Sequence, residues 1–209
     1  MVTGFGVDTD VFRYRAGSAP GAPTFVYPGT YSERHGADIF AAALGLLLDE
    51  RPGGARLDFY GTGTDARKIL DACPERHRHA IAFHAPVAAD RIAQIMSAAT
   101  AGLASVKPGE NYDYAFATKA LALMATGCPV VYAGPGPAAG VVDEVSRQHG
   151  AGRAVEFDVQ AVADAMRNVL DNPLHAKGRQ GLAEWIHEHH AARSVADRVA
   201  AHVLDALST

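Results

Sequence analysis

Cysteine is scarce in this chain: Cys73 and Cys128 are the only two in 209 residues. Because they lie far apart and lack the spacing of metal-binding motifs, we expect two reduced structural thiols. The chain also lacks an apolar run long enough to span a membrane, and its first residues lack the basic and then apolar pattern of a signal peptide. These absences predict a cytoplasmic protein without an integral membrane segment.

An excess of basic charge is missing as well. The formal net charge is -4, and no basic stripe occurs along the sequence, so a small molecule is favoured as partner and nucleic acid is not. Ala191 stands where the second histidine of H-E-x-x-H would follow His187, and no serine lies in a G-x-S-x-G elbow. We therefore predict no metal site, and no hydrolase chemistry of that kind.

What is present is the composition of a globular domain, with 48% hydrophobic and 20% charged residues. Short apolar runs alternate with helical patterns. Strands are expected at 24–27, 56–60, 79–83, 101–106, 129–132 and 154–157, and helices at 37–49, from Thr64, and at 89–98, 115–126, 140–148, 159–170, 178–190 and 191–207. Such alternation requires right-handed crossovers. We predict an α/β fold, a Rossmann-like doubly wound parallel sheet of about six strands with helices on both faces and extra C-terminal helices.

The chain divides into two parts on composition. Residues 13–23 are rich in Gly, Pro and Ala without periodicity, so residues 1–23 are predicted to be a linker or a strap on the surface, and residues 24–209 the domain. In the last helix, Val195, Val199 and Val203 share one apolar face. This face could pack on a partner, but we expect it to pack on the domain's own core.

The isolated Lys119 lies in an apolar helical run, Ala117 to Gly127. Burial of an unpaired ammonium is costly, so this lysine needs a carboxylate or a bound anion as its partner. The start of a helix also favours phosphate binding. The lysine and the helix start together predict a diphosphate site. The alternatives are a pair with Glu110 or Asp113, or an ammonium that reaches water along its methylene stem.

Loops at the carboxyl ends of parallel strands are where ligands bind in such sheets. The relevant loops are 29–36, 61–63, 84–87, 107–114 and 133–137. The Gly61-Thr62-Gly63 turn is weak evidence by itself, because tight turns need glycine for conformational reasons alone. A dinucleotide-type G-x-G-x-x-G follows none of the expected strands.

Several segments occur in the order found in a known family. They are Gly6-Val7-Asp8-Thr9-Asp10-Val11-Phe12, Gly61-Thr62-Gly63, Ala117-Thr118-Lys119 through Met124-Ala125, Gly127-Cys128-Pro129-Val130-Val131, and Trp185 in a late helix. Over almost its whole length the chain resembles the C-terminal, donor-binding domain of the family 4 (group 1) retaining glycosyltransferases of GT-B fold.

The resemblance implies that the chain binds a nucleoside-diphosphate sugar as donor substrate, without cofactor or metal, and that the glycosyl group is transferred with retention to an unknown acceptor. Lys119 and Glu110 would be the catalytic residues, and the amides of Ala115 and Phe116 would join Lys119 at the diphosphate. Donor-binding roles then fall to Gly29, Thr30, Arg34, His35, Gly61, Gly63, His84, Val87, Asp113 and Tyr114. The loop with His84 and Val87 would face the base, and Glu110 to Tyr114 the sugar.

The chain departs from the family pattern at two acidic positions. The paired glutamates of the family would fall at Tyr114 and Ala122, and neither is acidic. The cations that follow the first strand are replaced by Thr30 and His35, so Arg34 or His35 must supply a charge. Three hypotheses stay open: a divergent donor site, a catalytically degenerate binding or interaction domain, and half of a sugar-nucleotide epimerase.

The resemblance also implies that an N-terminal acceptor domain is missing. The inter-domain signature begins at Gly6, with only Met1 to Phe5 before it. We expect the chain to be either an excised fragment or a short protein whose other half is a partner chain. Transfer activity is not expected from the chain alone.

Overall fold

The computed structural model describes residues 4–16, 22–109 and 111–207. Within these residues one sheet contains β1 (Thr24–Pro28), β2 (Arg56–Tyr60), β3 (Ile81–His84), β4 (Ala101–Ser105), β5 (Val130–Ala133) and β6 (Gly152–Val155). All neighbours pair in parallel, in the order β3-β2-β1-β4-β5-β6. This is the strand order of a Rossmann-like fold, and it confirms the predicted doubly wound sheet.

Helices connect and follow the strands. They are α1 (Asp38–Glu50), α2 (Ala66–Ala72), α3 (Ala89–Ala98), α4 (Lys119–Ala125), α5 (Pro137–His149), α6 (Val159–Asp171), α7 (Ala176–His190) and α8 (Ala192–Leu207), with 3-10 turns η1 (Glu33–His35) and η2 (Glu75–Ala80). Local chemistry sets several of their ends. The Asp158 side chain caps α6 by accepting the Ala161 N–H, and Gly150 ends α5 in the left-handed conformation.

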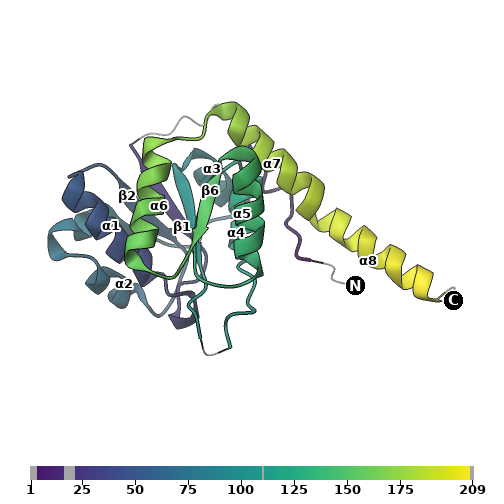
Figure 1. Ribbon diagram of the computed structural model, residues 1–209, viewed down its shortest axis with the longest axis horizontal. Coiled ribbons are helices and arrows are strands. Elements are labelled where there is room, and N and C mark those ends of the chain that lie inside the picture. The colour runs from purple at the N-terminus through teal and green to yellow at the C-terminus, as the bar shows by residue number, and fades with distance from the viewer. Residues whose placement is uncertain (1–3, 17–21, 110, 208–209) are drawn as a thin grey trace.

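The helices cover both faces of the sheet (Figure 1). Helices α1, α2 and α6 form one buried cluster with the sheet, and α3, α4, α5 and α7 form the other. Alternate residues of each strand face alternate clusters: Phe25 and Tyr27 of β1 lie in the first, and Val26 lies in the second. Burial on both faces explains why the strands read as short, nearly continuous apolar runs.

Several predicted boundaries were wrong, among them those of β6, expected at 154–157, and of α5, expected at 140–148. The helix expected at 115–126 begins only at Lys119, because residues 112–118 form turns in which Ala115 N–H donates to the Tyr112 carbonyl and Thr118 N–H to the Phe116 carbonyl. The strand expected from His79 begins at Ile81, since the preceding residues form η2.

The N-terminal segment packs against the end of α7. Val7 is buried, its N–H donates to the His190 carbonyl at 2.8 Å, and its carbonyl accepts from Ala192 N–H at 2.8 Å. The Phe5 ring stacks on Phe116 with centroids 4.4 Å apart. Residues before Thr24 therefore contribute to packing, while the domain boundary at residue 24 stays a prediction.

Helix α8 projects from the body of the molecule (Figure 1). Val199 is 36% exposed and Val203 is 49% exposed, so the prediction that this face packs on the domain core was wrong. The helix starts at the edge of the fold and runs away from it, which leaves its far half without core to cover.

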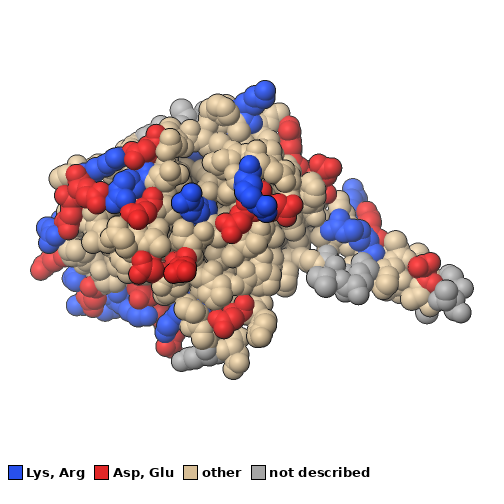
Figure 2. Space-filling view, viewed as in Figure 1, with Lys and Arg blue, Asp and Glu red and all other residues tan. Residues whose placement is uncertain are grey.

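Both cysteines are buried free thiols, as predicted. Among the described residues, no helix is long and apolar enough to cross a membrane. On the face seen in Figure 2, acidic and basic side chains are interspersed over the body of the molecule.

Candidate functional site

A cavity of about 760 Å³ opens at the carboxyl edge of the sheet. Its walls come from the loops after β1, β2 and β3, from the segment that leads into α4, from α3, and from the N-terminal segment. β1 and β4 are neighbours in the sheet, but α1 and α4 turn to opposite faces. The loops therefore diverge and leave a crevice at this switch point, where ligands bind in folds of this kind.

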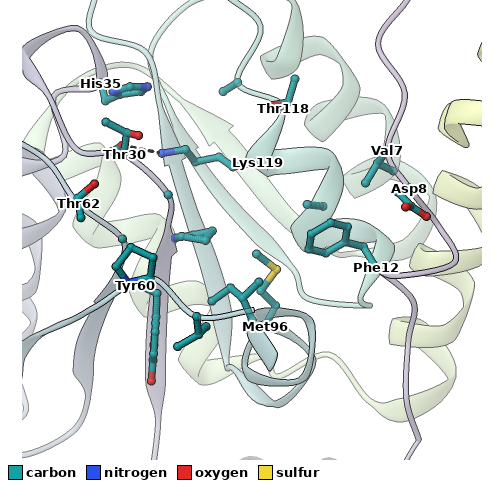
Figure 3. Close-up of a pocket in the computed structure, with 18 of the residues that line it drawn as sticks. Val7, Asp8, Phe12, Thr30, His35, Tyr60, Thr62, Met96, Thr118 and Lys119 are labelled. Atoms are coloured by element: carbon teal, nitrogen blue, oxygen red, sulfur yellow. Dashed lines mark hydrogen bonds between the residues drawn. The ribbon is translucent and has the colours of Figure 1, made fainter. Parts of the chain in front are cut away.

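The cationic part of the cavity is built around Lys119, the first residue of α4 (Figure 3). Its Nζ donates to the Thr30 carbonyl at 3.3 Å and lies 3.8 Å from the centroid of the Tyr27 ring. Among the described residues, no carboxylate forms an ion pair with Lys119, and Asp113 instead accepts from Gly109 N–H. Of the alternatives raised from the sequence, the pair with Asp113 is not formed, and Glu110 lies outside the described residues.

Arg34 and His35 join Lys119 in the cavity wall. Burial, with a smaller contribution from the Arg34 charge, lowers the pKa of Lys119 to about 7. Burial and the charges of Lys119 and Arg34 lower the pKa of His35 to about 4, and the His35 Nδ1 lies 2.9 Å from the Ser32 hydroxyl oxygen. Burial and the repulsion among these groups thus disfavour positive charge at this site, and a bound anion would relieve that repulsion.

The Gly61-Thr62-Gly63 turn is held against the loop after β1. Gly29 N–H donates to the Tyr60 carbonyl at 2.7 Å, and Tyr31 N–H to the Thr62 carbonyl at 3.3 Å. A Cβ on Gly61 would lie 2.2 Å from the Gly29 carbonyl oxygen, and one on Gly63 would lie 1.8 Å from that of Tyr31. Close backbone packing therefore explains both glycines, whether or not a ligand contacts them.

An apolar wall faces the cationic part of the cavity. It includes Tyr60, Pro86, Val87, Ile92 and Met96. The Tyr60 ring stacks on the His84 imidazole with centroids 4.4 Å apart, and this contact holds the Tyr60 ring in place. Such a wall suits the flat, largely apolar face of a nucleobase.

The structure brings together most of the residues predicted from the sequence. Those that line the cavity are Gly29, Thr30, Arg34, His35, Gly61, Val87, Phe116 and Lys119. Those that lie outside its lining are Gly63, His84, Asp113, Tyr114 and Ala115. Their ligand-binding roles stay predictions, as does that of Glu110, which lies outside the described residues.

The sugar-side residues are the least well placed. Tyr114 is 86% exposed, and the Asp113 carboxylate accepts a hydrogen bond from Gly109 N–H within its own loop. The Ala115 amide is used in a turn, so it would have to exchange its bond with Tyr112 for one with a ligand. Among the described residues, no group of three or more His, Cys, Asp or Glu is placed to hold a metal ion.

Sequence reasoning missed the contribution of the N-terminal segment. Val7, Asp8 and Phe12 line the cavity (Figure 3). The carboxylate of Asp8 caps its own turn, with Oδ1 accepting from Asp10 N–H at 3.0 Å. The apolar residues Val7, Val11 and Phe12, which alternate with Asp8 and Asp10, are the signal that could have placed this segment against the domain.

Comparison with solved structures supports this fold. Sucrose-phosphate synthase from Thermosynechococcus elongatus is similar with a TM-score of 0.78 and 18% identity, over 100% of this chain and 53% of that one. Anabaena HepE, solved in complex with UDP and glucose, is similar with a TM-score of 0.69 and 14% identity, over 96% of this chain and 55% of that one. This chain thus spans about half of the length of either protein.

A third structure is closer in extent. The C-terminal domain of a glycosyl transferase group 1 family protein (LpcC) from Francisella tularensis has a TM-score of 0.63 and 21% identity, over 88% of this chain and 95% of that one. At these low sequence identities, the structural similarity of the three proteins shows a shared fold. A search of curated protein sequences found no match.

The fold and the cavity define a class of protein, a Rossmann-like α/β domain with a cavity at the carboxyl edge of its sheet. Residues 22–172 match the family model described as glycosyl transferases group 1. The chain belongs to this family, as its sequence motifs predicted.

Proposed function

We propose that this chain is the donor-binding domain of a retaining glycosyltransferase, and that its cavity binds a nucleoside-diphosphate sugar. The observation that carries the proposal is the ammonium of Lys119, which faces a cavity of about 760 Å³ and contacts a carbonyl and a ring in place of a carboxylate. A half-buried cation held in this way is available for an anion.

The cavity offers complementary surfaces for the parts of such a donor. Lys119, Arg34, Tyr60, Pro86 and Val87 line the cavity. In the proposed complex, Lys119 and Arg34 would contact the diphosphate, and the other three would contact the base. When the bond between the sugar and the diphosphate breaks, negative charge grows on the leaving diphosphate. Fixed cations beside it stabilise that charge more than they stabilise the intact donor, and this difference lowers the barrier.

The acceptor side is proposed to come from a second domain. Sucrose-phosphate synthase and HepE are each about twice as long as the part that this chain matches. We therefore infer that transfer requires an N-terminal acceptor domain, in the same chain or in a partner. HepE was solved with UDP and glucose, which makes UDP the first nucleotide to test.

Isothermal titration calorimetry of the chain with UDP, and then with GDP, ADP and dTDP, tests the proposal. We expect one of them to bind. Lys119→Ala should weaken the binding of that nucleotide at least about tenfold, because a charge-assisted hydrogen bond contributes roughly 1.5–3 kcal/mol. Lys177→Ala is the matched control, since Lys177 is exposed on α7 and lies away from the cavity.

Two outcomes would contradict the proposal. Binding that is equal in Lys119→Ala would remove the role of this lysine. Absence of binding by all four nucleotides would favour the second candidate function, a degenerate interaction domain. That candidate is supported by Ala122, which lines the cavity at one of the two positions where the family has a glutamate.

A further inference from the structure

The ring of Tyr27 lies directly beneath the ammonium group of Lys119. The Nζ of Lys119 is 3.8 Å from the ring centroid, within the range of a cation–π interaction. Tyr27 is fully buried near the end of β1, where its ring also contacts Phe59 and Phe40 at centroid distances of 5.3 and 6.0 Å. The aromatic cluster gives this platform a fixed position.

The backbone carbonyl of Thr30 completes the arrangement. It accepts a hydrogen bond from Lys119 Nζ at 3.3 Å and one from the Tyr27 hydroxyl at 3.4 Å. Both contacts of the ammonium are therefore uncharged, one with a π face and one with a carbonyl. A carboxylate in either place would hold the lysine but would cancel its field in the cavity.

We propose that Tyr27 is a positioning residue for Lys119: its ring holds the ammonium above the end of β1 and leaves that group directed at the cavity. The proposal rests on the proposed function, in which Lys119 is the cation that meets the diphosphate. Neither the family match nor the similar structures assign this role to Tyr27.

The charged and titratable groups around this pair are few in the described part of the chain. Asp8, Arg34, His35 and Tyr60 line the same cavity, and Asp65 acts on Tyr27 through its charge. The lowered pKa of His35, about 4, leaves that ring neutral above pH 5, and burial raises the pKa of the Tyr27 phenol. Between pH 6 and 9 the titration of Lys119 can therefore be followed by itself.

The test measures the pKa of Lys119 directly in the free protein. The chain has four lysines, Lys68, Lys107, Lys119 and Lys177, so labelling with ¹³Cε-lysine gives few NMR signals. The signal of Lys119 is the one missing from the Lys119→Met variant. Each form of the protein is titrated from pH 5.5 to 10.

The variants change the electron density on the face of the aromatic ring and keep its shape. Tyr27→Phe retains the π face and should leave the Lys119 pKa near that of the native protein. Incorporation of 3,4,5-trifluorophenylalanine at position 27 withdraws electrons from the ring and should lower the pKa by about half to one unit. Because ring size is nearly unchanged, this comparison does not depend on a variant with a cavity in the core.

Tyr132 is the matched control. It is fully buried in β5, and its hydroxyl donates to the Pro135 carbonyl at 2.7 Å, three residues along the chain, as Tyr27 does to Thr30. Tyr132→Phe and the trifluorinated ring at position 132 should leave the Lys119 pKa unchanged.

A second readout separates positioning from a structural role. With UDP, or whichever nucleotide binds, trifluorination at position 27 should weaken binding about three- to tenfold at pH 8, where Lys119 has lost its proton, and leave it unchanged at pH 5.5. A loss of equal size at both pH values would mean that the ring acts only through packing, and would overturn the proposal.

The two proposals fail in different ways. A Lys119 pKa that is the same with and without fluorine at position 27 would overturn the role of Tyr27, even if nucleotides bind normally. A pKa that falls as expected, in a protein that binds none of the nucleotides, would support the pairing of Tyr27 with Lys119 and contradict the proposed function.

Discussion

An ammonium that rests on an aromatic ring responds to pH differently from one in a salt bridge. Burial lowers the pKa of Lys119 to about 7, so near neutral pH this residue exists in both charge states. A bound diphosphate favours the charged state and raises the pKa. Anion binding above pH 7 should therefore take up a proton.

This coupling predicts that nucleotide affinity falls as pH rises. Between pH 7 and 9 the Kd of UDP should increase, by up to about tenfold per pH unit, because the free protein must first be protonated at Lys119. Calorimetry in two buffers of different ionisation enthalpy, at pH 8, should show uptake of close to one proton per nucleotide.

Two variants test the assignment of that proton. His35→Gln should keep the pH dependence, because the pKa of His35 is already lowered to about 4 in the free site. Lys119→Met should remove it. Proton uptake that persists in Lys119→Met would mean that another group titrates.

At the scale of single residues, the sequence predicted the importance of Lys119 but gave no indication of the role proposed for Tyr27. A single lysine in an apolar helical run is an anomaly that demands a partner, so it can be found by inspection. A tyrosine in a buried strand is ordinary core composition. Only the packing of β1 beside the start of α4 places that ring under the ammonium.

Among the elements, α7 is joined to the end of α3 and the turn into β4, on the same face of the sheet, by a buried arginine. Arg179 is 9% exposed, and its guanidinium donates to the carbonyls of Leu174, Ser97 and Ala99. In the described part of the chain it forms no ion pair with a carboxylate. The carbonyls that end α3 and start the turn into β4 thus obtain their donors from α7.

Arg179→Met should lower the free energy of unfolding by about 2–4 kcal/mol, because it removes charge-assisted hydrogen bonds and leaves buried carbonyls without donors. Urea denaturation followed by circular dichroism measures the loss. Arg147→Met on the exposed face of α5 is the control, and it should change stability by less than about 0.5 kcal/mol. Equal effects would show that the buried carbonyls find other partners.

The element boundaries show where local patterns stop being informative. The spans of β2 and α3 agree with the predicted ranges 56–60 and 89–98, because alternating or helical apolar patterns are continuous there. The segment before Lys119 has helical composition as well, but Phe116 is drawn onto Phe5 and the chain forms turns instead. This contact joins residues more than a hundred positions apart, so a local pattern does not reveal it.

The molecule as a whole has a compact body and a projecting helix (Figure 1). Side chains from residue 196 to 206 of α8 are exposed, whereas Ala191 is buried and Ala192 N–H bonds to Val7. The stability of the body should therefore depend on the first residues of this helix and not on its far half.

Two truncated chains test this division by differential scanning calorimetry. A chain that ends at residue 198 should unfold at nearly the same Tm as the full chain. A chain that ends at residue 190 loses the buried Ala191 and the Ala192 N–H that donates to the Val7 carbonyl, which should cost on the order of 1–2 kcal/mol and lower the Tm by about 2–8 °C. A large loss in the longer truncation would show that α8 packs on the body in solution.

The sequence by itself determined the class of fold, the family, and the lysine on which the site is centred, whereas the order of the strands came from the structure. The first three follow from periodicities of a few residues and from motifs, which act locally along the chain. Tertiary structure alone decided that Tyr27 lies under Lys119, that Phe12 reaches the cavity, and that α8 leaves the core. Such contacts join residues that are distant in sequence, and they depend on how closely side chains fill space.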